Sequence, residues 1–228
     1  VAPTWVTSQN RSFELADVEP SGAFGTADFS RPGQASLESW SGTLSAEMAV
    51  GEDPSDILRI RAAGQQRPGL ADWVQEGAVL GLQGGTERVR GIVSDMQESG
   101  ADISAVWLQD WTGKRVTDFG DRLWWTWQLD DQTYPGWKQM VDDFHKQDIK
   151  VLTYVNIMVV DSADKSGKPV TNLYRQAEAR GFLVKDQSGK PYLADQNGYD
   201  AALVDLTNPK ARDWYADVIA DDVLGIGV

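Results

Sequence analysis

Apolar and polar positions follow two different patterns along the chain. In residues 1–66, short alternating segments at 12–15 and 42–50 are separated by clusters of Gly, Pro and Ser, which is typical of antiparallel strands joined by turns. A short helix is expected at 54–63, because Pro54 stands in its first turn and Asp53 precedes it as a cap. The segment AAGQQRPGLADW then indicates a linker, which we place at 67–76.

From residue 77 onward, short apolar runs alternate with helical patterns. The runs GAVLGLQ, ISAVWLQ, KVLTYVNIMVV and AALVDLTN have the composition of strands buried on both faces. Helices are predicted between them at 86–99, 135–147 and 172–180, and Pro209 opens a last one. GFLVKDQSGKPYLAD resembles a hairpin with a Ser-Gly turn. Strands that alternate with helices predict right-handed βαβ units and a parallel sheet.

Polar residues follow the predicted strands at the point where each strand ends. They are Gln83, then Gln109 with Asp110, then Asn156 and Asp205. The carboxyl ends of parallel strands lie at one edge of the sheet, which is where a (β/α) barrel builds its active site. A complete eight-stranded barrel needs about 250 residues, whereas residues 77–228 supply four strand–helix steps. The pattern therefore predicts either a small open α/β sheet or part of a larger barrel.

Composition and charge narrow the classes of function. The net charge of −13 argues against nucleic acid as a partner, since that binding depends on neutralising phosphates. No apolar run reaches the length of about 18 residues that a membrane-spanning helix needs, so no membrane partner is expected. The chain has no Cys and one His, His145, which excludes thiolate metal sites and sites built on two histidines. The chemistry must come mainly from Asp, Glu, Arg, Gln, Tyr and Trp.

The strand ends offer the first candidate site residues. Gln83 is an amide at the end of a buried strand, so it either bonds to the neighbouring backbone or belongs to a binding site. Gly84 and Gly85 after it are explained by a tight turn, because they lack the Lys and the spacing of a phosphate-binding loop. Asp110 either caps the next turn or binds a ligand at the sheet rim. Ligand binding is favoured, because Gln109 and Asp110 precede an aromatic cluster.

The segment DRLWWTW places Arg122 just before Trp124, Trp125 and Trp127. Some of these tryptophans must belong to the core. An Arg beside an indole N–H can form an anion pocket, because the guanidinium donates a planar fork of hydrogen bonds and the indole donates one. The alternative is an Arg that stacks on a Trp or pairs with a neighbouring aspartate. The residues by themselves leave both interpretations open.

Three segments resemble glycoside hydrolase family 31, and within it most of all the sulfoquinovosidase branch. They are DWVQEGAVLGLQGGTE, VWLQDWTGKRVTDFGDRLWWTWQLD with the YP that follows, and VDLTNPKA. The resemblance covers most of the chain and is strongest at 71–135. It implies an α/β fold in which residues 1–66 form the C-terminal part of an N-terminal β-sandwich. Residues 77–228 would form the first four βα units, that is the first half, of a (β/α)8 TIM barrel.

The same resemblance implies a retaining α-glycoside hydrolase that uses two carboxyl groups and no cofactor. The substrate would be a small sugar, an α-sulfoquinovoside, whose sulfonate is recognised by two Gln, an Arg, a Trp and a Tyr. The first four fall on Gln83, Gln109, Arg122 and Trp125 with the motif spacing intact, while the Tyr has no counterpart here. Asp110 would contact a sugar hydroxyl. Hydrogen-bond donors suit a sulfonate, which offers three acceptor oxygens and a fixed charge.

The family's nucleophile and acid/base lie on later segments than those matched here. We therefore expect no catalytic residue within these 228 residues, and we expect the remainder of the barrel on a missing segment or another chain. Two other functions stay open. One is an α-glucosidase or α-xylosidase of the same family, and the other is a non-catalytic carbohydrate-binding module with the Trp cluster as its stacking platform. Against the module, half a barrel would expose a sheet edge and unburied core.

Overall fold

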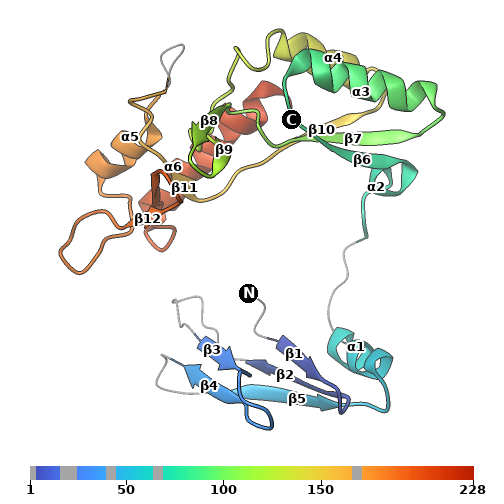
Figure 1. The fold of residues 1–228 in the computed structure, drawn as a ribbon, viewed down its shortest axis with the longest axis vertical. Helices are drawn as coiled ribbons and strands as arrows, with labels where there is room; N and C mark the ends of the chain where they lie inside the picture. Colours follow the sequence, from blue (N-terminus) through green and yellow to red (C-terminus); the bar gives the residue numbers. More distant parts are fainter. Residues whose placement is uncertain (1–3, 16–24, 40–44, 64–68, 166–170) are drawn as a thin grey trace. The chain divides into compact units, whose positions relative to one another are not determined.

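The computed structural model describes residues 4–15, 25–39, 45–63, 69–165 and 171–228 (Figure 1). The chain divides into two compact units, Val1–Gly69 and Leu70–Val228. Among the helices of the described residues, none combines the length and the apolar character needed to cross a membrane.

The first unit is antiparallel, as the alternating pattern predicts. Strands β1 (Thr4–Thr7), β2 (Arg11–Leu15) and β5 (Ala46–Val50) form a sheet in the order β1-β2-β5, and β3 (Gly25–Asp28) pairs with β4 (Ser36–Ser39). The part of the predicted 42–50 strand before residue 45 lies outside the described residues.

Helix α1 (Pro54–Ala62) follows this sheet, and its N-terminus is the predicted one. The Asp53 side chain accepts a hydrogen bond from the backbone N–H of Asp56, which satisfies one of the free donors of the first turn. Near the other end, the Arg61 guanidinium donates to Ser12 Oγ at 2.8 Å and pairs with Glu14 at 3.0 Å, both on β2. These contacts hold the helix against the sheet.

The second unit begins with a short helix and a three-stranded parallel sheet. Helix α2 (Trp73–Glu76) occupies part of the segment that we expected to be linker. Strands β6 (Ala78–Leu82), β7 (Ile103–Leu108) and β10 (Lys150–Thr153) pair in the order β10-β7-β6, all parallel. Helices α3 (Thr86–Glu98) and α4 (Trp137–His145) connect them and lie on one face of the sheet (Figure 1).

Side chains of the two helices and of the sheet meet in the main core. Val89 and Val93 of α3 and Met140 and Phe144 of α4 are buried against apolar residues of β7 and β10, including Val106, Leu108 and Val151. On the opposite face of β7, Trp107 is 38% exposed. The helical spacing of the apolar residues of α3 and α4 thus determines which face of each helix packs against the sheet.

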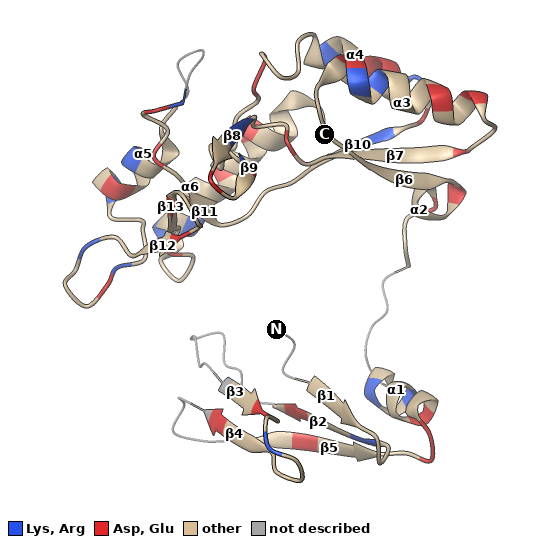
Figure 2. Ribbon diagram, in the orientation of Figure 1, with Lys and Arg blue, Asp and Glu red and all other residues tan. Residues whose placement is uncertain are grey.

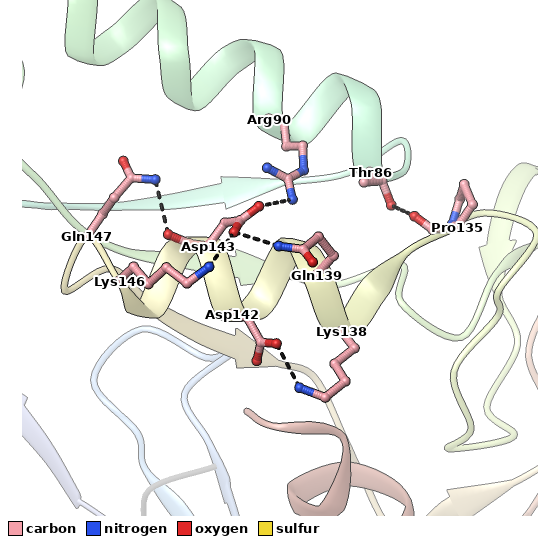
Figure 3. Close-up of polar contacts among 9 residues, drawn as sticks. All are labelled: Thr86, Arg90, Pro135, Lys138, Gln139, Asp142, Asp143, Lys146 and Gln147. Carbon is pink, nitrogen blue, oxygen red and sulfur yellow. Dashed lines mark hydrogen bonds and ion pairs between the residues drawn. The ribbon is translucent and has the colours of Figure 1, made fainter.

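A polar network also fixes α3 to α4 (Figure 3). The Asp143 carboxylate of α4 accepts hydrogen bonds from Arg90 of α3 at 2.8 Å, from Gln139 at 2.7 Å and from Lys146 at 3.1 Å. Those bonds hold the pKa of Asp143 at about 2, below its ordinary value of 3.8, and Arg90 makes the largest contribution. At the start of α3, the Thr86 hydroxyl donates to the Pro135 carbonyl at 2.7 Å.

The segment between β7 and α4 contains a hairpin and three buried aromatic anchors. Strands β8 (Lys114–Thr117) and β9 (Gly120–Leu123) form the hairpin. The indole N–H of Trp111 donates to the Tyr154 carbonyl and that of Trp127 donates to the Met158 carbonyl, each at 2.8 Å. Both rings and Tyr134 have no exposed surface. Part of the Trp cluster is therefore core, as the sequence required.

The prediction of one strand at 150–160 is wrong, because the strand breaks after Thr153 and the chain turns before Met158. The Asn156 side chain accepts the backbone N–H of Met158 at 2.7 Å, and the Asn156 carbonyl accepts the Tyr215 hydroxyl. These bonds divert backbone groups that a continuous ladder would use. Only Lys150–Thr153 remains in the parallel sheet.

The prediction of a fourth parallel strand is also wrong. Strand β13 (Asp200–Leu203) lies between β11 (Met158–Val159) and β12 (Leu193–Asp195) and is antiparallel to both. Residues 193–195 thus pair with β13. The expected hairpin with its Ser-Gly turn is confirmed over 184–192, where the Asp186 N–H donates to the Lys190 carbonyl and the Tyr192 N–H to the Val184 carbonyl, beside the Lys185–Pro191 bridge. Because the chain has turned at Asn156, its next extended residues meet β13 from the opposite direction.

Helices α5 (Leu173–Arg180) and α6 (Pro209–Val218) complete the unit, with a π-helical turn at Ile219–Val223 and a 3-10 turn at Leu224–Ile226. Asn172 and Asn208 cap the two helices by accepting backbone N–H groups of their first turns. Pro209 stands at the first turn of α6, as predicted.

Candidate functional site

A cavity of about 280 Å³ opens beside the carboxyl ends of β6 and β7. Its lining residues come from those strand ends, from the β8–β9 hairpin and from two later segments: Gln83, Gln109, Lys114, Asp121, Arg122, Leu123, Trp125, Tyr154 and Tyr199. The described residues contain no group of three or more His, Asp or Glu side chains that could hold a metal ion.

The pairing of β6 with β7 brings the two glutamines together. Leu82 lies opposite Leu108 in the parallel register, so Gln83 and Gln109 leave neighbouring strands at the same height. The Gln83 amide donates to the Gln109 side-chain oxygen at 2.8 Å. The chain then turns sharply through Gly84 and Gly85, whose φ angles of 103° and 90° favour glycine.

Arg122 and Trp125 line the same cavity. The Arg122 guanidinium donates to the backbone carbonyl of Asp121 at 3.1 Å, and none of the ion pairs among the described residues involves Arg122. The indole N–H of Trp125 is buried and has no hydrogen-bond partner. Unsatisfied buried donors are rare, because each one costs about 1–3 kcal/mol.

The fifth predicted residue, Asp110, lies next to the cavity and does not line it. Its side chain is 1% exposed and accepts the backbone N–H of Gly84 at 2.9 Å and the hydroxyl of Tyr134. Lys114 Nζ lies 3.4 Å from Asp110 Oδ2, the oxygen that also accepts the Gly84 N–H. Burial and the hydrogen bond to Asp110 raise the pKa of the Tyr134 phenol above its ordinary value of 10.0. The predicted contact of Asp110 with a sugar hydroxyl stays a prediction.

Several cavity residues escaped the sequence reasoning. Lys114 begins β8 and carried no strand-end signal, whereas Tyr154 directly follows the third parallel strand, where that signal was present. Tyr199 had no such signal, because it lies in the turn before β13, far from the cavity in sequence. Asn156, which the strand-end pattern did select, donates to the Tyr154 hydroxyl at 2.7 Å and so orients a cavity wall.

Aromatic and cationic side chains stack behind the cavity wall. The Tyr199 ring meets Trp125 edge-on with 5.7 Å between their centres. The Arg115 guanidinium lies 4.1 Å from the centre of the Tyr199 ring and 3.5 Å from that of Trp124. Burial lowers the pKa of Arg115 and raises that of Tyr199, which the Arg115 charge partly opposes.

A buried ion pair joins the loop after Trp127 to the loop before residue 166. Asp130 and Lys165 pair with side chains only 11% and 8% exposed, and Asp130 also accepts the backbone N–H of Thr133 at 2.9 Å. Burial acts to raise the pKa of Asp130, but the bonds from Lys165 and Thr133 outweigh it and lower the pKa. The pair ties the segment that follows the hairpin to the segment that follows β11.

The fold and the position of the cavity at the sheet edge together indicate the class of protein. Residues 78–228 match the family model described as the glycosyl hydrolases family 31 TIM-barrel domain, and the chain belongs to this family. The described portion of the barrel is the three parallel strands with the cavity at their carboxyl ends, the position of active sites in this fold.

Two curated relatives from this family are sulfoquinovosidases. The sequence is 31% identical to the sulfoquinovosidase of Escherichia coli (strain K12) over 201 residues, and 34% identical to that of Agrobacterium fabrum over 230 residues. These alignments cover 88% and 99% of this chain but 28% and 32% of the relatives. The chain therefore spans about a third of the length of the curated relatives it matches.

A solved structure agrees with these relatives. The family 31 sulfoquinovosidase from E. rectale, in complex with the aza-sugar inhibitor IFGSQ, superimposes with a TM-score of 0.77 at 30% identity. The alignment covers 100% of this chain and 32% of that structure.

Proposed function

We propose that this chain forms the sugar-binding part of a retaining α-glycoside hydrolase that cleaves α-sulfoquinovosides and releases sulfoquinovose. The single observation that carries the proposal is the cavity that Gln83, Gln109, Arg122 and Trp125 line together. The indole N–H of Trp125 is buried without a partner, and a sulfonate oxygen would supply the missing acceptor. The sulfoquinovosidase relatives support this choice of sugar.

The cavity suits a charged monosaccharide in its other features. Its volume of about 280 Å³ is just below the range of about 300–1,000 Å³ for small-molecule sites. The paired amides of Gln83 and Gln109 leave further donor and acceptor positions facing the same space. Two cationic side chains, Lys114 and Arg122, stand in a protein of net charge −13, and the basic residues of β8 are visible in Figure 2.

In this proposal the chain supplies two parts of a larger enzyme. Residues 1–66 form the C-terminal part of an N-terminal β-sandwich, and residues 77–228 contribute the first parallel strands of a (β/α)8 barrel. The antiparallel sheet of the first unit and the βαβ order of β6, β7 and β10 support that assignment. The two carboxyl groups of retaining hydrolysis, one nucleophile and one acid/base, would come from the remainder of the barrel.

The test compares hydrolysis of an aryl α-sulfoquinovoside with that of the matching α-glucoside by the complete enzyme. We expect kcat/KM to favour the sulfonated substrate. Arg122→Ala should remove that preference while sparing glucoside cleavage. Trp125→Phe keeps the ring and removes the N–H, so the preference should fall about 10- to 100-fold, the value of a hydrogen bond to a charged group.

Equal rates on the two substrates with the wild-type enzyme would favour the α-glucosidase of the same family. An α-xyloside as the preferred substrate would favour the α-xylosidase. Sugar binding with no turnover by the complete protein would favour the carbohydrate-binding module. Survival of the discrimination in Arg122→Ala would remove Arg122 from the anion pocket.

A further inference from the structure

Asp110 places a buried carboxylate next to the cavity that we assign to an anionic sugar. The Asp110 side chain is 1% exposed, and two of its partners, the Gly84 N–H and the Tyr134 hydroxyl, are neutral donors. The third partner, Lys114, is the cation with which Asp110 forms an ion pair, at 3.4 Å. Lys114 also lines the cavity and is 30% exposed. One lysine therefore faces both the buried charge and the space for the ligand.

The charged side chains around the cavity indicate a role for Lys114 in charge balance. The charged lining residues are Lys114, Arg122 and Asp121, and Asp110 lies directly behind Lys114. With Lys114 present, two cations balance two carboxylates. Without it, Arg122 alone would face two carboxylates, and an anionic sugar would enter a site of net negative charge. An uncompensated unit charge about 10 Å from an anion changes its binding on the order of tenfold at an effective dielectric of about 20.

The fold fixes Lys114 in this position. It is the first residue of β8 and lies opposite Leu123 of β9, the neighbour of Arg122. Before it, Gly113 has a φ of 83°, and its backbone N–H donates to the Asp110 carbonyl at 2.9 Å. The tight turn at 110–113 brings the lysine back over the aspartate that precedes it by four residues. An exposed ion pair contributes little to stability, whereas removing one member of a buried pair leaves an uncompensated charge.

We propose that Lys114 determines specificity for an anionic sugar by neutralising the buried Asp110 carboxylate, so that the charge of Arg122 stays available to the ligand. This inference rests on the proposed function. It gives Lys114 a role through charge balance, and the lysine need not touch the substrate for the role to hold.

The experiment measures the ratio of kcat/KM for an aryl α-sulfoquinovoside to kcat/KM for the aryl α-glucoside with the complete enzyme. The variants are Lys114→Met, Lys114→Arg and the double variant Asp110→Asn/Lys114→Met. We expect Lys114→Met to lower the ratio about tenfold, and Lys114→Arg to retain it. The double variant removes both charges, so its ratio should recover to within about threefold of the wild type. The ratio cancels any contact of Asp110 with a sugar hydroxyl, since both substrates carry that hydroxyl.

Lys138→Met is the matched control, because Lys138 pairs with Asp142 along the exposed side of α4 and does not line the cavity. An unchanged ratio in Lys114→Met would overturn the inference, as would an equal loss in the single and double variants. If Lys114→Met does not fold, Lys114→Arg and the double variant decide, because charge balance predicts that both keep the ratio. A wild-type enzyme without preference for the sulfonated sugar would instead refute the proposed function.

Discussion

The guanidinium of Arg115 lies 4.1 Å from the centre of the Tyr199 ring, which joins the β8–β9 hairpin to the turn before β13. Tyr199 lines the cavity and meets Trp125 edge-on. A residue outside the cavity lining thus holds one of its walls. We expect a double-mutant cycle of Arg115→Met and Tyr199→Leu to give a coupling energy of about 0.5–2 kcal/mol, the value of a partly desolvated cation–π contact.

Urea unfolding of the wild type, both single variants and the double variant measures this coupling. The control cycle is Arg175→Met with Tyr174→Leu, a looser pair with 5.3 Å between guanidinium and ring centre and an Arg side chain that is 59% exposed. Its coupling should be the smaller of the two. Additive effects of the Arg115 and Tyr199 substitutions would show that the contact does not stabilise the fold.

The hydroxyl of Tyr134 supports the buried charge of Asp110. Tyr134→Phe removes that donor and leaves the carboxylate with the Gly84 N–H and Lys114. We expect a loss of about 1–3 kcal/mol in the free energy of unfolding, because a buried charged acceptor loses a partner. Tyr174→Phe is the control, since the Tyr174 hydroxyl bonds to Glu178 at 3.2 Å on the partly exposed side of α5. Similar losses in the two variants would contradict the special role of Tyr134.

The network around Asp143 makes stability depend on pH. The pKa of Asp143 is about 2 in the folded protein and 3.8 ordinarily, mainly because Arg90 donates to the carboxylate. A lowered folded pKa contributes stability above pH 3.8, and that contribution is lost as the pH falls toward 2. In urea unfolding between pH 5 and pH 2, Asp143→Asn should therefore lose less stability than the wild type does.

Asp142→Asn is the control for that comparison, because Asp142 bonds to Lys138 of the same helix and does not reach α3 (Figure 3). It should follow the wild-type dependence more closely than Asp143→Asn does. Wild-type and Asp143→Asn curves that stay parallel from pH 5 to pH 2 would show that the Asp143 network does not contribute.

Two glycines should respond to alanine in opposite directions. Gly85 has a φ of 90°, and an added Cβ would overlap the Thr133 carbonyl oxygen, so Gly85→Ala should destabilise by about 2 kcal/mol or more. Gly91 lies within α3 with open space around its Cβ position, so Gly91→Ala should stabilise by about 0.5–1 kcal/mol. Thermal unfolding of the two variants tests both signs. A tolerated Gly85→Ala would show that the turn after Gln83 can relax.

Local patterns predicted most elements but not their long-range partners. The cap at Asp53, the helix from Thr86 and the Pro209 helix start all follow from residues close together in sequence. The orientation of β13 depends instead on the turn that Asn156 makes and on the two strands that pair with its two edges. An apolar run carries no information about those partners, so AALVDLTN by itself predicts one more parallel strand.

The sequence alone determined that Gln83 and Gln109 lie side by side, because adjacent parallel strands end at the same sheet edge, whereas Arg122 and Trp125 were indicated only by the family resemblance. The tertiary structure decided which other side chains lie at that edge and which of them line the cavity. It buried Asp110 out of the cavity lining, set Lys114 against it and brought Tyr199 to face Trp125. These side chains come into contact only after the hairpin and the β11–β13–β12 sheet have packed. Hydrophobic periodicity predicts which face of an element is buried, but it does not predict contacts between distant elements.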